Sequence, residues 1–252
     1  MKFLLQTIGN EVVYDFAFAL EQSREFYGWL MQDMAIKHHE GTDFADVGTP
    51  DEYVPVGAVE FVSEYLRRFY PECQEALRPL NVPEALFPFA GRHIVNVWYA
   101  EDYAPMAGVK DIYVKSMDTI KDPWNGPKYD IPGEYEWKDF RHCQVSEFID
   151  IASEWRALVF HNDILYVANY GGDPLLFPDA GAIREMTKAY AGEAPVAYTL
   201  DVAVTGSGDT VVIECHRFFS CGLYGYNDHR RYPVMLSQAW KEMIRKIVRN
   251  AK

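Results

Sequence analysis

Short apolar runs, many of them alternating with polar residues, recur along this chain and predict β-strands, most of them in the C-terminal two thirds. Two pairs of runs are separated by short polar turn segments, His161-Asn162-Asp163 in one pair and Gly206-Ser207-Gly208-Asp209 in the other. Each pair is typical of a β-hairpin, so we expect mainly antiparallel pairing in this region. The expected strands span residues 1–8, 111–116, 143–149, 154–160, 164–170, 198–204 and 210–216.

Apolar residues at helical spacing predict helices as well. Asp179 is a suitable N-cap for one of them, and Gly192 follows its expected end. Residues 41–57 and 79–108 are expected to be connections, and residues 117–140 a loop or small lid. Together, these helices and strands place the chain in the α+β class. The expected helices lie within residues 10–40, over 58–70 and 179–191, and from Pro233 to about residue 248.

The chain carries 24 basic and 37 acidic residues, a net charge of −13. A field of this sign repels nucleic-acid backbones and anionic lipid, so we expect neither a nucleic acid nor a membrane as a partner. No apolar run approaches the roughly 20 residues that a membrane-spanning helix needs, and the first residues resemble a strand more than a signal peptide. The four cysteines form no CxxC pair, which is typical of thiols in a reducing cytosol, so a cytoplasmic location is expected.

The hairpin expected over residues 198–216 carries acidic residues within otherwise apolar strands. A symmetric turn would place Asp201 opposite Glu214, with Cβ atoms about 4.5–5.5 Å apart on one face. His216 lies two residues beyond Glu214 and therefore shares that face. Two facing carboxylates repel each other unless a cation lies between them, and a hard divalent cation that also binds phosphate oxygens would remove this repulsion. The alternative is a solvated face with an incidental pair of acids.

Other charged residues lie where an anionic ligand could be bound. Lys115 interrupts an apolar strand, so its amine either reaches solvent at a sheet edge or is directed towards an anion. Glu154 and Arg156 share one strand face; Arg156 either neutralises Glu154 or contacts a phosphate or a substrate carboxylate. Lys121 and Lys128 lie in the glycine-containing loop, which either closes over phosphates or is simply solvated.

The order of these segments resembles the ATP-grasp superfamily, and most closely a small branch of it found in phage and bacterial genomes. The resemblance covers roughly residues 90–226 and rests on order and spacing more than on any single motif. The segments that carry it are the strand with Lys115, then Ser146-Glu147-Phe148-Ile149, Ser153-Glu154-Trp155-Arg156, Leu200-Asp201-Val202-Ala203-Val204 and Val212-Ile213-Glu214-Cys215-His216.

The resemblance implies roles for individual residues. Lys115 would reach the nucleotide phosphates and Arg156 would lie near the transferred phosphate, both as catalytic residues. The acidic Mg²⁺ ligands would be Asp201 and Glu214. His216 falls where the family usually has asparagine, a departure that would shift the preference towards Mn²⁺, leave a water in that position, or mark an impaired enzyme. The remaining nucleotide-binding residues would be Glu147, Phe148 and Ile149 at the adenine and ribose, together with Glu154 and Lys128.

The resemblance also implies an architecture and a reaction. Two β-rich lobes would clasp ATP: a small lobe over residues 103–146 and a C-terminal lobe over 147–252. Together they form an ATP-grasp domain (91–252) that follows an N-terminal α/β lobe (1–90). The expected enzyme is an ATP-dependent carboxylate-amine ligase that forms an amide or peptide bond through an acylphosphate, on a small-molecule or peptide substrate with an amine co-substrate. The alternatives are an ATP-dependent phosphotransferase and a catalytically impaired nucleotide-binding module.

Overall fold

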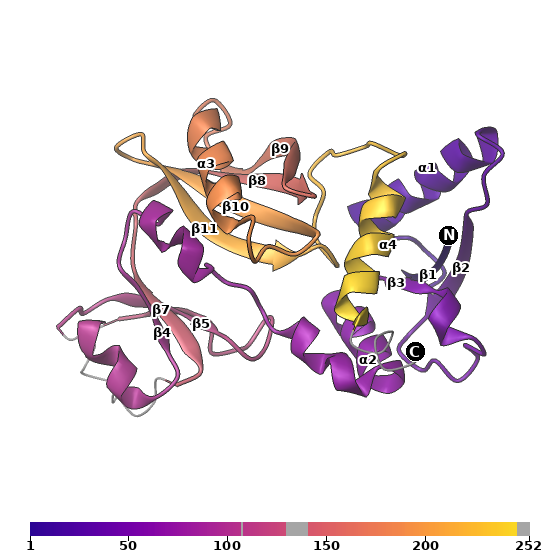
Figure 1. Ribbon diagram of the computed structural model, residues 1–252, viewed down its shortest axis with the longest axis horizontal. Helices are drawn as coiled ribbons and strands as arrows, with labels where there is room; N and C mark the ends of the chain where they lie inside the picture. The colour runs from indigo at the N-terminus through magenta and orange to yellow at the C-terminus, as the bar shows by residue number, and fades with distance from the viewer. Residues whose placement is uncertain (107, 130–140, 246–252) are drawn as a thin grey trace. The chain divides into compact units, whose positions relative to one another are not determined.

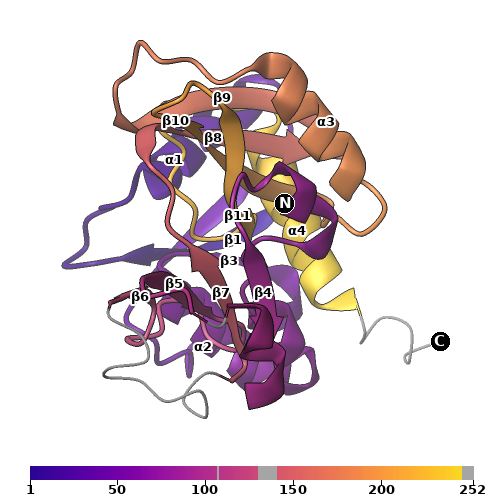
Figure 2. The same ribbon diagram turned by 90° about the vertical axis from the view of Figure 1, so that its left-hand side faces the viewer.

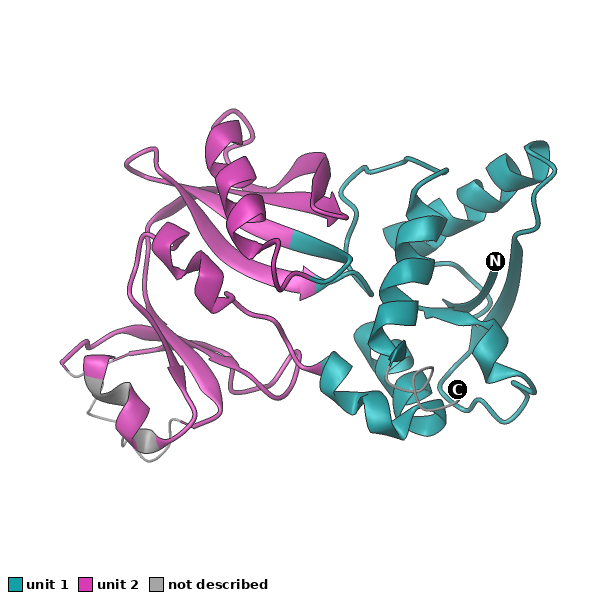
Figure 3. Ribbon diagram, in the orientation of Figure 1, with its two compact units in different colours: residues 1–77, 195–199, 217–252 teal, residues 78–194, 200–216 magenta. Residues whose placement is uncertain are grey.

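The computed structural model describes residues 1–106, 108–129 and 141–245 (Figure 1). The chain divides into two compact units (Figure 3): unit 1 contains residues 1–77, 195–199 and 217–252, and unit 2 contains residues 78–194 and 200–216. This division differs from the expected boundary at residue 90. The first unit ends earlier along the chain, and the C-terminal segment returns to it.

Unit 1 is built on a small parallel sheet. Its strands are β1 (Lys2–Thr7), β2 (Ala35–Glu40) and β3 (Val54–Val56), in the order β2-β1-β3. Strand β2 lies in the region expected to be helical, and its sequence Ala-Ile-Lys-His-His-Glu has too few apolar residues to indicate a strand. It is a strand because it pairs along its whole length with β1, whose apolar residues Phe3, Leu4 and Leu5 are fully buried.

The helices of unit 1 are α1 (Asp15–Trp29), α2 (Val59–Phe69) and α4 (Tyr232–Met243), and two 3₁₀ helices, η1 (Pro50–Glu52) and η2 (Pro71–Leu77), lie between them in the sequence. Trp240 of α4 packs edge-on against Tyr65 of α2, with ring centroids 5.8 Å apart. This contact joins segments 175 residues apart in sequence, which explains why the C-terminal helix belongs to the N-terminal unit. The expected end of this helix, near residue 248, lies outside the described residues.

The first sheet of unit 2 is antiparallel and small. Its strands are β4 (Ile94–Val97), β5 (Ile112–Ser116), β6 (Gly126–Lys128) and β7 (Cys143–Glu147), in the order β4-β7-β5-β6. Strand β4 lies in a segment expected to be a connection and β6 in the segment expected to be a loop or small lid, because each strand is too short to show a period. The helices η3 (Glu84–Phe89) and η4 (Ala100–Met106) flank β4 along the chain. Part of the expected lid, residues 130–140, lies outside the described residues.

A second sheet, most of which belongs to unit 2, contains β8 (Ile151–Phe160), β9 (Asp163–Gly172), β10 (Ala197–Thr205) and β11 (Thr210–Arg217), in the order β11-β10-β8-β9. Only residues 197–199 of β10 and Arg217 of β11 are assigned to unit 1. Both expected hairpins are present. His161 and Asn162 have φ angles of 51° and 64°, as a two-residue hairpin turn requires. Helix α3 (Ala180–Tyr190) lies beside this sheet in both views (Figures 1 and 2). Its expected N-cap, Asp179, accepts a hydrogen bond from the Ala182 N–H.

These sheets and helices confirm the α+β class. All four cysteines are free and buried. Among the described residues, no helix has both the length and the apolar character needed to cross a bilayer.

Candidate active site

A cleft of about 600 Å³ opens within unit 2 and is lined by residues of both its sheets. This volume falls within the range of sites that hold a small ligand. Several residues singled out from the sequence line the cleft, although they come from β5, β7, β8 and β11 and the segment after β7. They are Lys115, Glu147, Phe148, Ile149, Glu154, Glu214 and His216.

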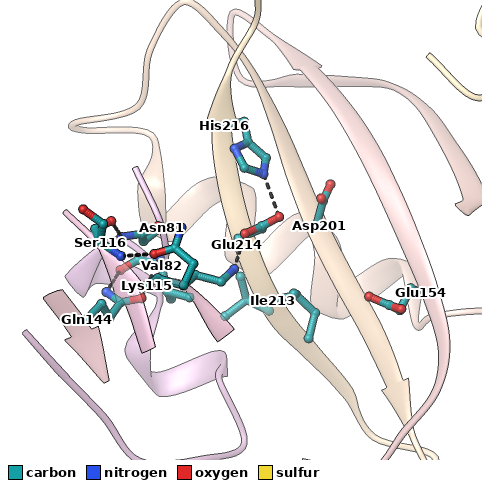
Figure 4. Close-up of polar contacts among 12 residues, drawn as sticks. Asn81, Val82, Lys115, Ser116, Gln144, Glu154, Asp201, Ile213, Glu214 and His216 are labelled. Atoms are coloured by element: carbon teal, nitrogen blue, oxygen red, sulfur yellow. Dashed lines mark hydrogen bonds and ion pairs between the residues drawn. The ribbon is translucent and has the colours of Figure 1, made fainter. Parts of the chain in front are cut away.

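A lysine, a glutamate and a histidine that line this cleft meet one another (Figure 4). The Lys115 amine donates to Glu214 Oε2, and His216 Nε2 lies 2.7 Å from Glu214 Oε1. Burial by itself raises the pKa of Glu214, but the hydrogen bond from His216 and the positive charge of Lys115 outweigh it and hold that pKa well below its usual range. The Glu214 carboxylate is therefore ionised at neutral pH.

The contact of the Lys115 amine decides between the two interpretations of this residue. Strand β5 lies between β7 and β6, although its pairing with β6 ends at Val114. The Lys115 amine is directed towards an anion, the Glu214 carboxylate, and the two side chains are 21% and 22% exposed. A phosphate group entering the cleft would present a second anion to the same amine.

Asp201 lies on the strand next to β11 and is paired differently. Arg156 Nε donates to Asp201 Oδ1 at 2.8 Å, and Arg156 Nη2 donates to Oδ2 at 2.7 Å. Both side chains are buried, with 10% and 1% exposure. Arg156 therefore pairs with Asp201 and not with Glu154, whose carboxylate accepts a hydrogen bond of 3.1 Å from the Tyr170 hydroxyl.

Asp201, Glu214 and His216 nevertheless form one group of donor atoms. One ligand atom from each lies within 4.8 Å of the other two. Each carboxylate oxygen has two lone pairs and uses one of them in the bonds described above, so both carboxylates can still coordinate a metal. Two carboxylates and an imidazole fit a divalent cation, and the imidazole favours Mn²⁺ over Mg²⁺ relative to an all-oxygen set.

The residues after β7 form an apolar rim of the cleft. Phe148 is 42% exposed and stacks against Tyr129, with ring centroids 5.7 Å apart. Glu147 is anchored through its backbone N–H, which donates to the His93 carbonyl at 3.1 Å, and its carboxylate accepts from the His93 N–H at 2.9 Å. Next to this anchored residue, Phe148 and Ile149 offer a flat apolar surface suited to an aromatic base.

Lys128, expected to bind the nucleotide, is not among the cleft-lining residues. It is buried, donates to the Trp124 carbonyl at 2.8 Å, and lies 5.1 Å from the centroid of the Trp124 ring. These contacts give Lys128 a place in the packing of its own loop. Lys121, from the same loop, does line the cleft.

The cleft is also lined by residues that the sequence did not single out, among them Asn81, Arg92, Gln144 and Tyr170. Arg92 donates to the carbonyls of Val212 at 2.8 Å and Ile213 at 3.4 Å, and burial lowers the pKa of Arg92 to about 10. Gln144 gave only a weak signal, because in the strand Cys-Gln-Val-Ser-Glu it alternates with apolar residues as any polar face would. Asn81 and Arg92 gave no comparable signal, because each lies in a connection without a period.

The comparisons with known proteins give the family and the fold of this chain. The family described as ATP-grasp domain, R2K clade family 2, matches residues 89–234, more than half of the chain. The chain belongs to this family. The ATP-grasp superfamily and fold expected from the sequence are thus confirmed, and family membership agrees with the expected enzyme class, an ATP-dependent ligase of ATP-grasp type. The matched segment contains every residue of the cleft except Pro79 and Asn81.

Solved structures share the ATP-grasp fold of this chain. D-cycloserine synthetase DcsG has a TM-score of 0.59 at 12% identity, over 96% of this chain and 100% of that one. The ADP complex of purK, an N5-carboxyaminoimidazole ribonucleotide synthetase, has a TM-score of 0.55 at 11% identity, over 92% of this chain and 76% of that one. The ATP-grasp ligase PsnB, complexed with a minimal precursor, has a TM-score of 0.53 at 9% identity, over 94% of this chain and 98% of that one. A search of curated protein sequences found no match.

Proposed function

We propose that this ATP-grasp protein is an ATP-dependent carboxylate-amine ligase that forms an amide or peptide bond through an acylphosphate. The observation that carries the proposal is the meeting of Lys115 with Glu214 in the cleft, beside the donor atoms of Asp201 and His216. This arrangement places a lysine amine beside carboxylate oxygens that could coordinate a metal, as binding of a nucleoside triphosphate with its metal requires.

The proposed reaction has two steps, and the chain's residues contribute positioning and charge. An oxygen of the substrate carboxylate attacks the γ-phosphorus of ATP, and ADP leaves. The amine nitrogen then attacks the acyl carbon, phosphate leaves, and the nitrogen loses a proton. The Lys115 amine would bind the phosphates, and Arg156, held by Asp201, would supply fixed positive charge beneath them. A divalent cation held by Asp201, Glu214 and His216 would neutralise phosphate charge.

The base and the substrate remain to be placed in the cleft. We assign the adenine and ribose to the rim formed by Glu147, Phe148 and Ile149, with Glu154 facing the same cleft. Small-molecule and peptide carboxylates are both suitable substrate classes, because the structural neighbours include a D-cycloserine synthetase and a ligase complexed with a precursor. Four buried free thiols support a cytoplasmic location.

One observation favours a second candidate, a nucleotide-binding module without turnover. All four oxygens of Asp201 and Glu214 already accept hydrogen bonds or ion pairs from Arg156, Lys115 and His216. A metal would have to coordinate them alongside these partners or displace Lys115. If the partners do not rearrange, ATP could bind without being cleaved.

Thermal unfolding with ATP tests the proposal. We expect ATP with Mg²⁺ or Mn²⁺ to raise the Tm of the wild-type protein, because a ligand that binds only the folded state stabilises it. Lys115→Met should lower ATP affinity by about tenfold, whereas Lys188→Met on the exposed face of α3 should leave it unchanged. No rise in Tm with either metal would exclude a nucleotide site.

A screen for ADP release against carboxylates, with and without amines, tests the reaction itself. The ligase requires an amine for sustained ADP release and yields an amide. A phosphotransferase releases ADP with a hydroxyl substrate alone. Binding of ATP without ADP release under any of these conditions would identify the module.

A further inference from the structure

Strand β11, which carries Glu214 and His216, lies at one edge of its sheet. An edge strand has backbone groups that no neighbouring strand satisfies. One of these groups has a partner from outside the sheet: the N–H of Cys215 donates to the carbonyl of Asn81 at 2.6 Å, an isolated β-bridge. Because Cys215 lies between Glu214 and His216, this bond fixes the backbone that presents both side chains.

The side chain of Asn81 is bound on the other side of the cleft. Its Nδ2 donates to the carbonyl of Ser116 at 2.9 Å, the residue directly after Lys115 (Figure 4). The next residue, Val82, exchanges two hydrogen bonds with the Gln144 amide, of 3.0 and 2.9 Å. Gln144 is the register partner of Lys115 on the neighbouring strand. Residues 81 and 82 are therefore attached to the sheet of Lys115 at two points.

Asn81 therefore connects the backbone of Lys115 with the backbone of Glu214. It is buried and has a φ of 49°, in the left-handed region that asparagine tolerates better than most residues. A lysine side chain is flexible but of fixed length, so the position of its Cα limits the positions that its amine can reach. Strands β5 and β11 belong to different sheets, so no hydrogen-bond ladder sets the distance between them. Asn81 bonds to both strands.

We propose that Asn81 is a positioning residue that sets the separation of the Lys115 amine and the Glu214 carboxylate. In an ATP-binding cleft, that separation decides how phosphate and metal are held together, so this part of the proposal rests on the proposed function. Asn81 itself lies before the segment matched by the family, and neither its type nor its surroundings in the sequence indicated such a role.

The test uses Asn81→Gly, which keeps the backbone carbonyl bound to Cys215 and the positive φ but removes the bond to Ser116. Asn162→Gly is the matched control, because Asn162 also has a positive φ (64°) but lies in the exposed β8–β9 turn. In the protein without nucleotide, acetylation rates of individual lysines are measured by mass spectrometry. We expect Asn81→Gly to raise the rate at Lys115 roughly 2- to 10-fold, the effect of one hydrogen bond.

The control and all other lysines should keep their wild-type rates, which separates positioning from general loosening of the fold. An unchanged Lys115 rate in Asn81→Gly overturns the proposal whether or not ATP binds. If Asn81→Gly does not fold, Asn81→Asp has nearly the same shape but cannot donate to Ser116 when ionised, and the same rise at Lys115 is expected.

A second measurement relates the effect to the nucleotide. Asn81→Gly should weaken ATP binding roughly 2- to 10-fold in the wild-type background and have no further effect in a Lys115→Met background. Equal losses in both backgrounds would mean that Asn81 acts independently of Lys115, contrary to the proposal. Absence of ATP binding by the wild-type protein would refute the proposed function and leave the acetylation rates to decide on Asn81.

Discussion

Two ion pairs in unit 2, Arg156–Asp201 and Lys115–Glu214, differ in burial and in the number of hydrogen bonds they share. Arg156 and Asp201 are both buried and share two parallel hydrogen bonds, whereas Lys115 and Glu214 meet through a single amine and lie open to the cleft. A bidentate buried pair cannot open without leaving a charge in the protein interior. A lysine at the wall of a cleft can instead turn its amine towards an incoming anion, which then accepts the hydrogen bond that Glu214 accepted. We conclude that Arg156–Asp201 is the framework and Lys115–Glu214 the exchangeable part.

The largest effect is expected when one partner of the buried Arg156–Asp201 pair is removed. Arg156→Met should lower the free energy of unfolding by about 3–5 kcal/mol, because the Asp201 carboxylate is left buried without its cation. Chemical denaturation measures this change. Arg184→Met on the exposed part of α3 is the control and should change stability by less than about 0.5 kcal/mol. A similarly small loss for Arg156→Met would show that the pair is not a framework.

The double variant Arg156→Met with Asp201→Leu tests whether the lost stability comes from the unpaired carboxylate. Replacing both charges by apolar groups removes the unpaired carboxylate, so most of the lost stability should return. If the double variant is as unstable as Arg156→Met alone, the loss comes from packing of the arginine stem.

The exchangeable pair should behave in the opposite way. Glu214→Gln should lower metal-dependent ATP affinity by roughly 100-fold, since a neutral amide replaces a charged metal ligand, while the fold is retained. Isothermal titration with ATP and Mg²⁺ or Mn²⁺ measures the affinity. Glu193→Gln, which lies after α3 and outside the cleft, is the control. Retention of metal-dependent binding by Glu214→Gln would place the metal elsewhere.

The stability that Glu214 contributes is expected to depend on pH. The pKa of Glu214 is held well below the ordinary value of 4.5. Its partners therefore stabilise the fold at every pH at which Glu214 is ionised in the unfolded chain. This contribution is complete above pH 4.5 and is lost as the pH falls towards the folded-state pKa. The stability difference between the wild-type protein and Glu214→Gln should therefore shrink below that pH. A constant difference across the range would mean that Glu214 is not stabilised as a carboxylate.

The smallest expected effect concerns metal preference. His216→Asn replaces an imidazole by an amide oxygen, so the affinity for Mg²⁺ relative to Mn²⁺ should rise a few-fold, roughly 2- to 5-fold. Competition between the two metals in the presence of ATP measures the ratio. An unchanged ratio would show that His216 acts only as a hydrogen-bond partner of Glu214.

Some of this site could be predicted from local pattern. Alternation along β11 put Glu214 and His216 on one face, and their donor atoms do lie together with one from Asp201. Lys115 was recognised because a charge interrupts an apolar strand. The prediction for Lys128 did not anticipate that the chain would bury this residue against Trp124, since a lysine in a polar loop shows nothing of its contacts.

The hairpins, the Asp179 cap and the charged face of each strand follow from local sequence, because they depend on neighbours a few residues apart. Which charges meet depends on the packing of strands that are distant in the sequence. Arg156 could reach Glu154 two residues away, yet it pairs with Asp201, because β10 lies next to β8. Likewise, 99 residues separate Lys115 from Glu214. Strand periodicity gives the direction of a side chain, but the order of strands and the approach of two sheets decide what lies opposite it.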